Sequence, residues 1–222
     1  MLSKVVVVCF ISLFIQEINC ITRAEVNLQY SPTLQRLRTL SSTKYQEASR
    51  EYTTLTNQLA NQQQRTKNAT QTQINNIKTI IANAKKASNV TTTVLNCLRV
   101  QENIAARLTT TSMNNCYTSA NTSALVNNKA RFNTLATVAA NTVNWCNSLN
   151  PLETQLESYA RCLADKIPDL NRQINIVENE YQSMSSATLN YNVKCLTDNA
   201  GAVLGQIGVI SYEINICFFT PL

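Results

Sequence analysis

Apolar residues recur every three or four positions along most of this 222-residue chain. This spacing places apolar side chains along one face of a helix. Two sets stand out near the N-terminus: Tyr45, Ala48, Tyr52, Leu55 and Leu59, then Ile74, Ile77, Ile81 and Ala84. The two sets are out of phase, so the polar stretch 61–73 between them must contain either a coiled-coil stutter or a break.

Further helices follow the connection at 86–93, whose threonines 91–93 are good helix caps. The second helix is marked by Val94, Cys97, Leu98, Ile104, Ala105 and Leu108. After a polar loop at 117–123, the third helix keeps a heptad stripe of Leu125, Phe132, Leu135, Ala139, Thr142, Cys146 and Leu149. A restart with Asn150 as N-cap begins a fourth helix, and Pro168 is expected to end it before a fifth.

These patterns predict an all-α fold, because no segment shows the sustained alternation of a strand and no Gly or Pro lies between Pro32 and Pro151. We expect an elongated, disulfide-bonded helical bundle with a long N-terminal heptad-patterned helix. Its predicted domains are a coiled-coil-like arm at 21–93 and a bundle at 94–222. All three glycines lie after Asn199, and this tail is expected to form a closing hairpin or turn.

Residues 1–20 are typical of a secretory signal peptide, with Lys4 before the apolar run 5–15. Cleavage is predicted after Cys20 or after Ala24. An uncleaved anchor and a lipoprotein signal at Cys20 are the alternatives, although the apolar run is short for a membrane span. The tail after Asn199 is interrupted by polar residues, so no membrane span is expected after cleavage. Export agrees with the N-glycosylation acceptors Asn68, Asn89 and Asn121.

Six cysteines remain after removal of the signal, and an even number in an exported chain predicts disulfides. In a helical hairpin, residues equally far from the turn lie level with each other. This rule pairs Cys97 with Cys146 around the 117–123 loop, and Cys195 with Cys217 around the glycine-rich stretch. Elimination leaves Cys116 with Cys162.

Charge is distributed unevenly. From Ile21 to Asn150 there are 14 basic and 4 acidic residues, whereas from Pro151 onward there are 4 basic and 8 acidic ones. Arg65, Lys67, Lys78, Lys85 and Lys86 lie in a stretch without acidic residues and could contact an anionic surface. The alternative is a solvated helix face neutralised by the acidic C-terminal helices. Specific nucleic-acid binding is not expected, because aromatic residues are not interleaved with the basic ones.

Candidate catalytic chemistry is sparse. The chain has no histidine, which excludes Ser-His-Asp and Cys-His arrangements, and it has neither a P-loop nor a dinucleotide-binding motif. Glu153 is explained by the helix cap and Glu157 by Arg161 at i+4. Trp145 is expected to pack in the core against a disulfide. We therefore predict no catalytic, cofactor-binding or metal-binding residues.

A family resemblance rests on two short motifs. The segment 115–123, Asn-Cys-Tyr-Thr-Ser-Ala-Asn-Thr-Ser, resembles the Asn-Cys-Tyr-Ser segment of the TsetseEP-type domain of insect secreted proteins. The segment 191–196, Tyr-Asn-Val-Lys-Cys-Leu, resembles the late Tyr-x-x-x-Cys-Leu stretch of that domain. The resemblance covers roughly residues 97–199. It implies a secreted, disulfide-bonded helical domain without catalytic residues, and its name-giving member is an immune-responsive gut protein.

Two classes of function follow from these features. The first is a secreted, non-enzymatic interaction or structural protein that contacts an extracellular protein or a second copy through the heptad arm. The second is an extracellular carrier that holds a small apolar ligand inside its helical bundle.

Overall fold

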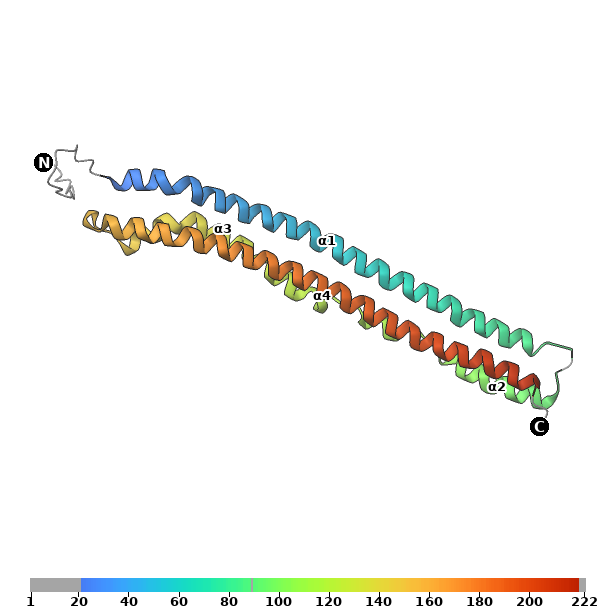
Figure 1. Ribbon diagram of the computed structural model, residues 1–222. Coiled ribbons are helices and arrows are strands. Elements are labelled where there is room, and N and C mark those ends of the chain that lie inside the picture. Colours follow the sequence, from blue (N-terminus) through green and yellow to red (C-terminus); the bar gives the residue numbers. More distant parts are fainter. Residues whose placement is uncertain (1–20, 89, 220–222) are drawn as a thin grey trace, which may run out of the picture. The chain divides into compact units, whose positions relative to one another are not determined.

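The computed structural model describes residues 21–88 and 90–219, and within them it contains helices and no strand. Four α-helices carry the fold: α1 (Arg23–Ala84), α2 (Thr92–Ala106), α3 (Ser123–Leu149) and α4 (Leu156–Phe219) (Figure 1). Three 3₁₀ turns connect them: η1 (Thr111–Asn115), η2 (Ser119–Thr122) and η3 (Glu153–Gln155). The all-α, disulfide-bonded bundle is confirmed. The predicted signal peptide and Asn89 lie outside the described residues.

The chain forms two compact units. Unit 1 comprises Met1–Tyr52 and Ala124–Met184, and unit 2 comprises Thr53–Ser123 and Ser185–Leu222. Each unit therefore takes in one part of α1 and one part of α4. This division differs from the sequence-based one, which separates an arm from a bundle after residue 93.

In unit 1, α1 and α4 run in the same direction, with α3 antiparallel to both (Figure 1). The contacts fix the parallel register: the Tyr159 hydroxyl donates to Asn27, and the Tyr181 hydroxyl donates to the Ala48 carbonyl at 2.7 Å, which are offsets of 132 and 133 residues. The Ser41 hydroxyl donates to the Phe132 carbonyl at 2.7 Å and ties α1 to α3. Unit 1 is thus a three-helix bundle.

The core of unit 1 follows the heptad pattern of α3. The predicted stripe is buried from Leu125 to Cys146, and only its last member, Leu149, is exposed. Apolar side chains of α1 and α4 in the same unit are buried too, including Leu34, Leu37, Leu163, Leu170, Ile174 and Val177. Helical periodicity was therefore sufficient to find this core.

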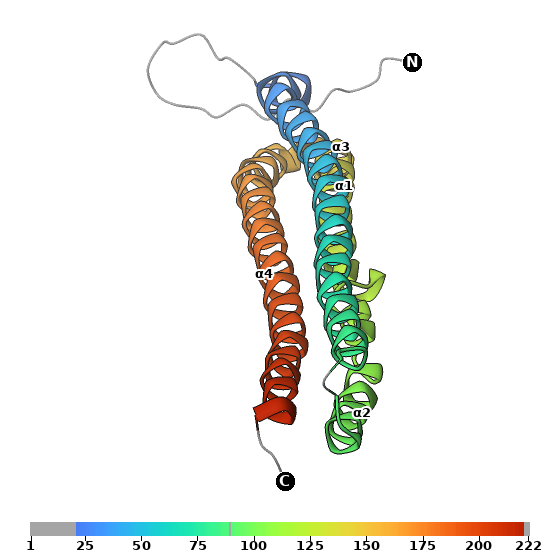
Figure 2. The ribbon, with the colours of Figure 1, turned by 90° about the vertical axis from the view of Figure 1, so that its right-hand side faces the viewer.

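An apolar cluster of unit 2 lies at the end of α1, separate from a smaller one at Met113, Cys116 and Leu196. The first is the larger. Its buried members are Ile74, Ile77 and Ile81 of α1, Leu98 and Ala105 of α2, Leu108, and Val203, Ile210, Ile214 and Cys217 of α4. Figure 2 shows α2 beside the last turns of α1. The Thr91 side chain accepts a hydrogen bond from the Val94 amide and caps α2, as the threonine run predicted.

The polar stretch 61–73 is a stutter and not a break, because α1 is one helix of 62 residues. Gln63 donates to the backbone carbonyls of Met113 and Asn114 at 2.6 and 3.1 Å, and Lys67 donates to the Asn114 side chain at 2.6 Å. Here hydrogen bonds attach α1 to η1. Polar side chains thus absorb the phase shift between the two apolar sets.

The start of α1 is fixed by a reciprocal capping box. The Glu25 carboxylate accepts from the Thr22 amide at 2.7 Å, and the Thr22 hydroxyl accepts from the Glu25 amide at 3.3 Å. These hydrogen bonds lower the pKa of Glu25. Helix α1 therefore begins nine residues before Pro32 and carries that proline inside.

Helix α4 corrects two predictions. It continues through Pro168, and it contains Gly201, Gly205 and Gly208, so neither the break at 167–169 nor the closing hairpin exists. Buried residues on both sides of Pro168, such as Leu163 and Leu170, hold the helix together. Tertiary packing outweighs the helix penalty of Pro and Gly, which is about 3 and 1 kcal/mol per residue.

The predicted disulfide pairing is wrong in all three pairs. The bridges are Cys97–Cys217, Cys116–Cys195 and Cys146–Cys162. Cys195 and Cys217 cannot pair, because 22 residues of one helix separate them by about 33 Å. The hairpin rule itself holds, but the turn that matters is the one at 150–155. The midpoints of the three pairs fall at residues 157, 155.5 and 154, so the bridges are nested around that turn.

That turn also differs from the prediction at two residues. Asn150 is not an N-cap: its side-chain amide donates to the Cys146 carbonyl at 3.0 Å and closes the end of α3. Trp145 does not pack in the core, because it is 46% exposed and lies under the Lys166 ammonium, which is 4.5 Å from the ring centroid.

Candidate interaction surface

The carboxylates singled out from the sequence are engaged in ion pairs. Glu153 lies 3.6 Å from Arg23, and Glu157 lies 3.2 Å from Arg161 as predicted. The Arg172 guanidinium beside Asp169 lowers the pKa of that carboxyl. Among the described residues, no group of three or more His, Cys, Asp or Glu side chains could hold a metal ion.

The buried tyrosines of unit 1 are structural. Burial raises the pKa of Tyr181 to about 12, and the nearby Glu51 carboxylate adds to this effect. Burial also raises the pKa of Tyr159, whose ring lies 4.6 Å from the Arg23 guanidinium. Both rings pack inside the bundle, so neither offers a hydroxyl to a substrate.

One surface of unit 2 does stand out: the exposed face of α4 beyond residue 190. It presents seven large side chains to solvent: Tyr191, Val193, Leu204, Val209, Tyr212, Phe218 and Phe219. Between Asp198 and Phe219 the only charged residue is Glu213. Large apolar side chains exposed in such numbers are typical of an interaction site on a protein.

The glycines of α4 lie on this same face. Gly201, Gly205 and Gly208 are exposed, and a Cβ atom placed on any of them would meet nothing within 4 Å. The glycines are therefore not required by packing within the described chain. They leave the helix backbone open to close approach from outside.

Part of α4 is as apolar as a membrane-spanning helix. The helix Glu153–Phe219 is long and apolar enough to cross a membrane by length and composition, and 22% of its most apolar 18-residue window is buried. A core helix of a soluble protein can meet the same criterion, but such a helix is mostly buried. This part of α4 thus has an unusually exposed apolar surface.

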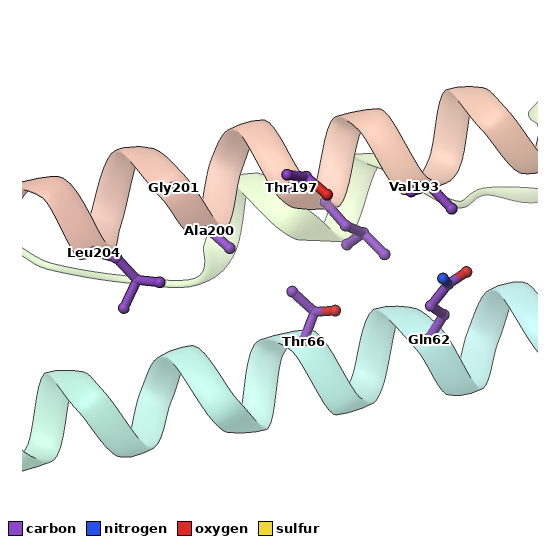
Figure 3. A pocket seen from close by; sticks show the side chains of 8 residues that line it. Gln62, Thr66, Val193, Thr197, Ala200, Gly201 and Leu204 are labelled. Carbon is purple, nitrogen blue, oxygen red and sulfur yellow. The ribbon is translucent and has the colours of Figure 1, made fainter.

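A groove adjoins this face, between α4 and α1 of unit 2 (Figure 3). It consists of two adjoining hollows of about 320 and 520 Å³ that share Thr66, Ala200 and Leu204. Leu204 and Ala200 point from α4 toward α1, and Thr66 and Gln62 point from α1 toward α4 (Figure 3).

The groove exists because of the residues at its walls. On the α4 side Ala200 and Gly201 are small, and on the α1 side the polar stretch supplies Thr66 and the buried Thr70 at inward positions where other turns of α1 carry leucine or isoleucine. Small residues on both helices leave the space between them unfilled.

One polar atom in the groove lacks a partner. The Gln62 side-chain oxygen is buried and accepts no hydrogen bond from the described part of the chain. An unpaired buried acceptor carries a desolvation cost that a donor from outside would remove. Arg65 is the one charged residue at the walls of the two hollows.

The basic residues predicted to contact an anionic surface are only partly available. Lys67 donates to Asn114, and Lys85 forms an ion pair with Glu102 at 2.8 Å. Arg65 and Lys78 are exposed, and Lys86 is half-buried. Intramolecular contacts thus occupy two of the five.

The glycosylation acceptors that the structure describes differ in accessibility. Asn68 is exposed on α1. Asn121 is half-buried, and its side-chain oxygen accepts from the Thr118 amide at 2.8 Å.

The sequence does not predict this surface, because the glycine-rich tail was expected to form a closing hairpin or turn. A hairpin would have buried the apolar residues around the glycines. The cysteine spacing contained the correcting signal: Cys162, Cys195 and Cys217 are 33 and 22 residues apart, both multiples of the 11-residue helical repeat. Such spacing places all three on one face of one long helix.

The fold and its bridges define an all-α, disulfide-bonded helical bundle with an exposed apolar helix face. No family model matches the chain, and no curated protein or solved structure matches it either. The resemblance to the TsetseEP-type domain therefore stays a prediction.

Proposed function

We propose that this protein is a secreted, non-enzymatic interaction or structural component of an insect extracellular fluid or of a gut or gland secretion. The observation that carries the proposal is the exposed, sparsely charged face of α4, with its large apolar side chains, beside the α1–α4 groove. Exposed apolar surface on a folded protein marks a site that a partner can cover. An immune role rests on the family resemblance alone and is part of the same proposal.

Three disulfides indicate that the chain folds in an oxidising compartment. Secretion is the finer proposal, and the capping box supports cleavage after Cys20. Cleavage after Ala24 would remove Thr22, and with it Arg23, which donates to Asn147, Asn150 and Leu152. N-terminal sequencing of the protein recovered from the medium is expected to begin at Ile21. Retention of the protein in the cells would contradict secretion.

Binding is tested with the full oxidised chain, expressed from its own signal in insect cells. The purified protein is crosslinked in extracellular fluid, and partners are compared between the wild type and the variant Leu204→Asp with Tyr212→Asp. We expect a defined partner that the variant loses. The matched control is Val100→Asp, at an exposed residue of α2 in the same unit. If wild type and variant capture the same set, the α4 face is not the binding surface.

The carrier of a small apolar ligand is the second candidate, because the groove has apolar walls at Val193, Leu196 and Leu204. The volume of each of its two hollows, about 320 and 520 Å³, falls in the range of small-molecule sites. Native mass spectrometry of the secreted protein would then detect a co-purifying ligand that Ala200→Trp expels. A wild-type mass equal to that of the glycosylated chain would contradict this candidate.

A further inference from the structure

Among the α-helices of the described chain, α1 alone has no cysteine. The six cysteines of the described residues lie between Cys97 and Cys217, and their bridges join α2, α3, α4 and the turn after η1. In unit 2 the apolar cluster holds α1, and in unit 1 packing and hydrogen bonds such as that from Ser41 do so. The peptide chain is therefore the only covalent attachment of α1.

The connection from α1 to α2 contains the only pair of adjacent basic residues in the sequence, Lys85 and Lys86. Helix α1 ends at Ala84, so both lysines lie just outside it, and Ala87 and Ser88 after them are exposed. Exposed connections with small and polar residues are preferred sites of proteolytic cleavage. The dibasic pair is thus in a segment that a protease can reach.

This connection is also the one at which a cut would divide the protein. The connections at 107–122 and 150–155 both lie between Cys97 and Cys217. A cut in either of them leaves the two pieces joined by that bridge. A cut between α1 and α2 leaves no bridge across it, because every bridge lies on its C-terminal side.

We propose that Lys85 and Lys86 form a cleavage site for a dibasic-specific serine endoprotease, which hydrolyses the peptide bond between Lys86 and Ala87 and makes this a two-chain protein. Water adds across the bond and leaves a carboxylate on Lys86 and an amine on Ala87. The inference rests on the export that is part of the proposed function, because such endoproteases act on exported chains.

The two lysines supply the charge that such a protease recognises. A dibasic-specific protease binds two adjacent positive charges in acidic subsites, by electrostatic complementarity. The Lys85 ammonium lies 2.8 Å from the Glu102 carboxylate of α2, and the two side chains are 28% and 50% exposed. A partly exposed ion pair of this kind is weak, so an acidic subsite can replace Glu102 as the partner of Lys85.

A protease binds its substrate in an extended form, so the last turn of α1 must open before the bond is cut. The Lys86 amide donates to the Asn83 carbonyl at 3.0 Å, and the Ala87 amide donates to the Ala84 carbonyl at 3.3 Å. These bonds span three residues, so the chain already departs from the α-helical pattern here. Helix ends open locally at a much lower free energy than the whole fold.

The cut would change how α1 is held. In the intact chain α1 belongs to the same molecule, which gives it a high effective concentration at its binding face. After the cut, buried residues such as Ile74, Ile77 and Ile81 hold it without a covalent link, so its release depends on protein concentration. Release would uncover Leu98 and Ile210 of the same cluster. Cleavage thus turns α1 into a separable subunit that covers an apolar surface.

Limited digestion of the purified, oxidised full-length protein tests the site. A dibasic-specific subtilisin-type endoprotease should cut the folded protein once, and SDS electrophoresis without reductant should separate the two fragments, the second beginning at Ala87. Lys86→Gln should slow the cut at least about a hundredfold, because it removes a charge that the protease recognises. Glu102→Gln should speed up the cut by up to about fivefold, since it frees Lys85.

Two controls separate the site from general susceptibility. Lys78→Gln replaces an exposed lysine of α1 and should leave the rate of cutting unchanged. Trypsin accepts a single basic residue, and a trypsin cut after the exposed Arg107 should release no fragment until the bridge between Cys97 and Cys217 is reduced. Far-UV circular dichroism verifies that each variant is folded.

Coexpression of the protein and the endoprotease in insect cells tests whether the cut accompanies export. The protein recovered from the medium should give two N-terminal sequences, one beginning at Ile21 and one at Ala87. The second sequence should be absent from the variant Lys86→Gln.

The results distinguish this inference from the proposed function. Folded protein that the endoprotease leaves intact, or secreted protein that stays a single chain, overturns the cleavage site. A cut whose fragments separate only after reduction also overturns it, because α1 would then be bridged. If the uncut protein captures an extracellular partner, the proposed function stands without the cleavage. If the cut occurs and no partner is found, the cleavage stands and the proposed function fails.

Discussion

Units 1 and 2 share the same two long helices but are held together differently. Six of the eight ion pairs among the described residues lie in unit 1, at Arg23, Lys44 (two), Arg131, Arg161 and Arg172. Two of the three disulfides lie in unit 2. Unit 1 has a third helix along its length, whereas unit 2 replaces part of it with the turns η1 and η2. Covalent bridges are thus concentrated where helix packing is interrupted.

Charge separates the units as well. The described part of unit 1 has ten basic and nine acidic residues, a net charge of +1, whereas that of unit 2 has eight basic and three acidic residues, a net charge of +5. Unit 2 also contains all three glycines and the exposed apolar face. Unit 1 is a packed bundle with nearly balanced charge. Unit 2 has glycines and exposed apolar side chains that do not contribute to its own packing.

The largest effect is expected from removing a bridge of unit 2. Replacing Cys116 and Cys195 together by alanine should lower the free energy of unfolding by about 4 kcal/mol, because the bridge closes a long loop of the unfolded chain. Urea denaturation followed by circular dichroism measures the loss. Trp145 is the single tryptophan and lies in unit 1, so its fluorescence should change at higher urea than the circular dichroism does.

The matched variant lacks the bridge between Cys146 and Cys162, which are 16 residues apart, and should lose about 3 kcal/mol. In that variant the fluorescence transition should move to lower urea. Coincident transitions in both variants would mean that the two units unfold as one.

Raising the pH should weaken unit 1 through Tyr181. Its pKa of about 12 exceeds the unfolded value of 10.0, so the folded state holds its proton over a range in which the unfolded state releases it. Stability should be unaffected by this group below pH 10 and should fall as the pH rises toward 12. Tyrosinate absorbance in a pH titration should include a component that appears only at the raised pKa of Tyr181, and this component should vanish in Tyr181→Phe. An unchanged titration curve in that variant would show that Tyr181 is not the group with the raised pKa.

The polar stretch of α1 should contribute to unit 2 and not to unit 1. Gln63→Ala removes two hydrogen bonds to the η1 backbone and should cost about 1–2 kcal/mol of stability. Circular dichroism in urea measures this cost. Gln64→Ala is the neighbouring control, since that residue is exposed and bonds only to Asn68 of its own helix. Equal losses in both variants would contradict a special role for the η1 contacts.

The smallest effect is expected from the ion pairs of unit 1. Lys44 lies 2.8 Å from Glu178 and 3.0 Å from Glu47, and these hydrogen bonds raise its pKa. Lys44→Met should cost about 0.5–1 kcal/mol, less at high salt, as measured by thermal unfolding. Since the pKa of Lys44 is raised, its contribution is present at neutral pH and is lost above the unfolded value of 10.5. A loss that salt does not reduce would point to packing of the lysine stem as its cause.

Helical periodicity predicted the elements whose apolar side chains are buried inside the bundle. The stripe of α3 from Leu125 to Cys146 and the cap of α2 are where the sequence indicates, and the connection between α1 and α2 lies at 85–91, one to two residues before the predicted 86–93. Periodicity did not reveal that α4 is continuous, because Pro168 and three glycines are local signals against a helix. Packing of distant residues on both sides of them decides the outcome, and no local pattern contains that information.

The exposed surface was harder to predict than the core. Apolar residues on two faces of a helix look alike in sequence, whether a neighbour in the same chain covers them or not. Val203 and Ile210 are buried against α1 and α2, whereas Val209 and Tyr212 are exposed on the opposite face. Separating them required the register of α4, which the nested cysteine pairs fix.

The nesting of those bridges has a consequence for how the chain matures. Cys146 and Cys162 are closest in sequence, so their encounter in the newly made chain carries the smallest entropy penalty. Once they join, Cys116 and Cys195 lie on arms that already start from a common point, and Cys97 and Cys217 follow in the same way. Oxidation can therefore proceed from the inside outward without any bridge having to be broken and remade.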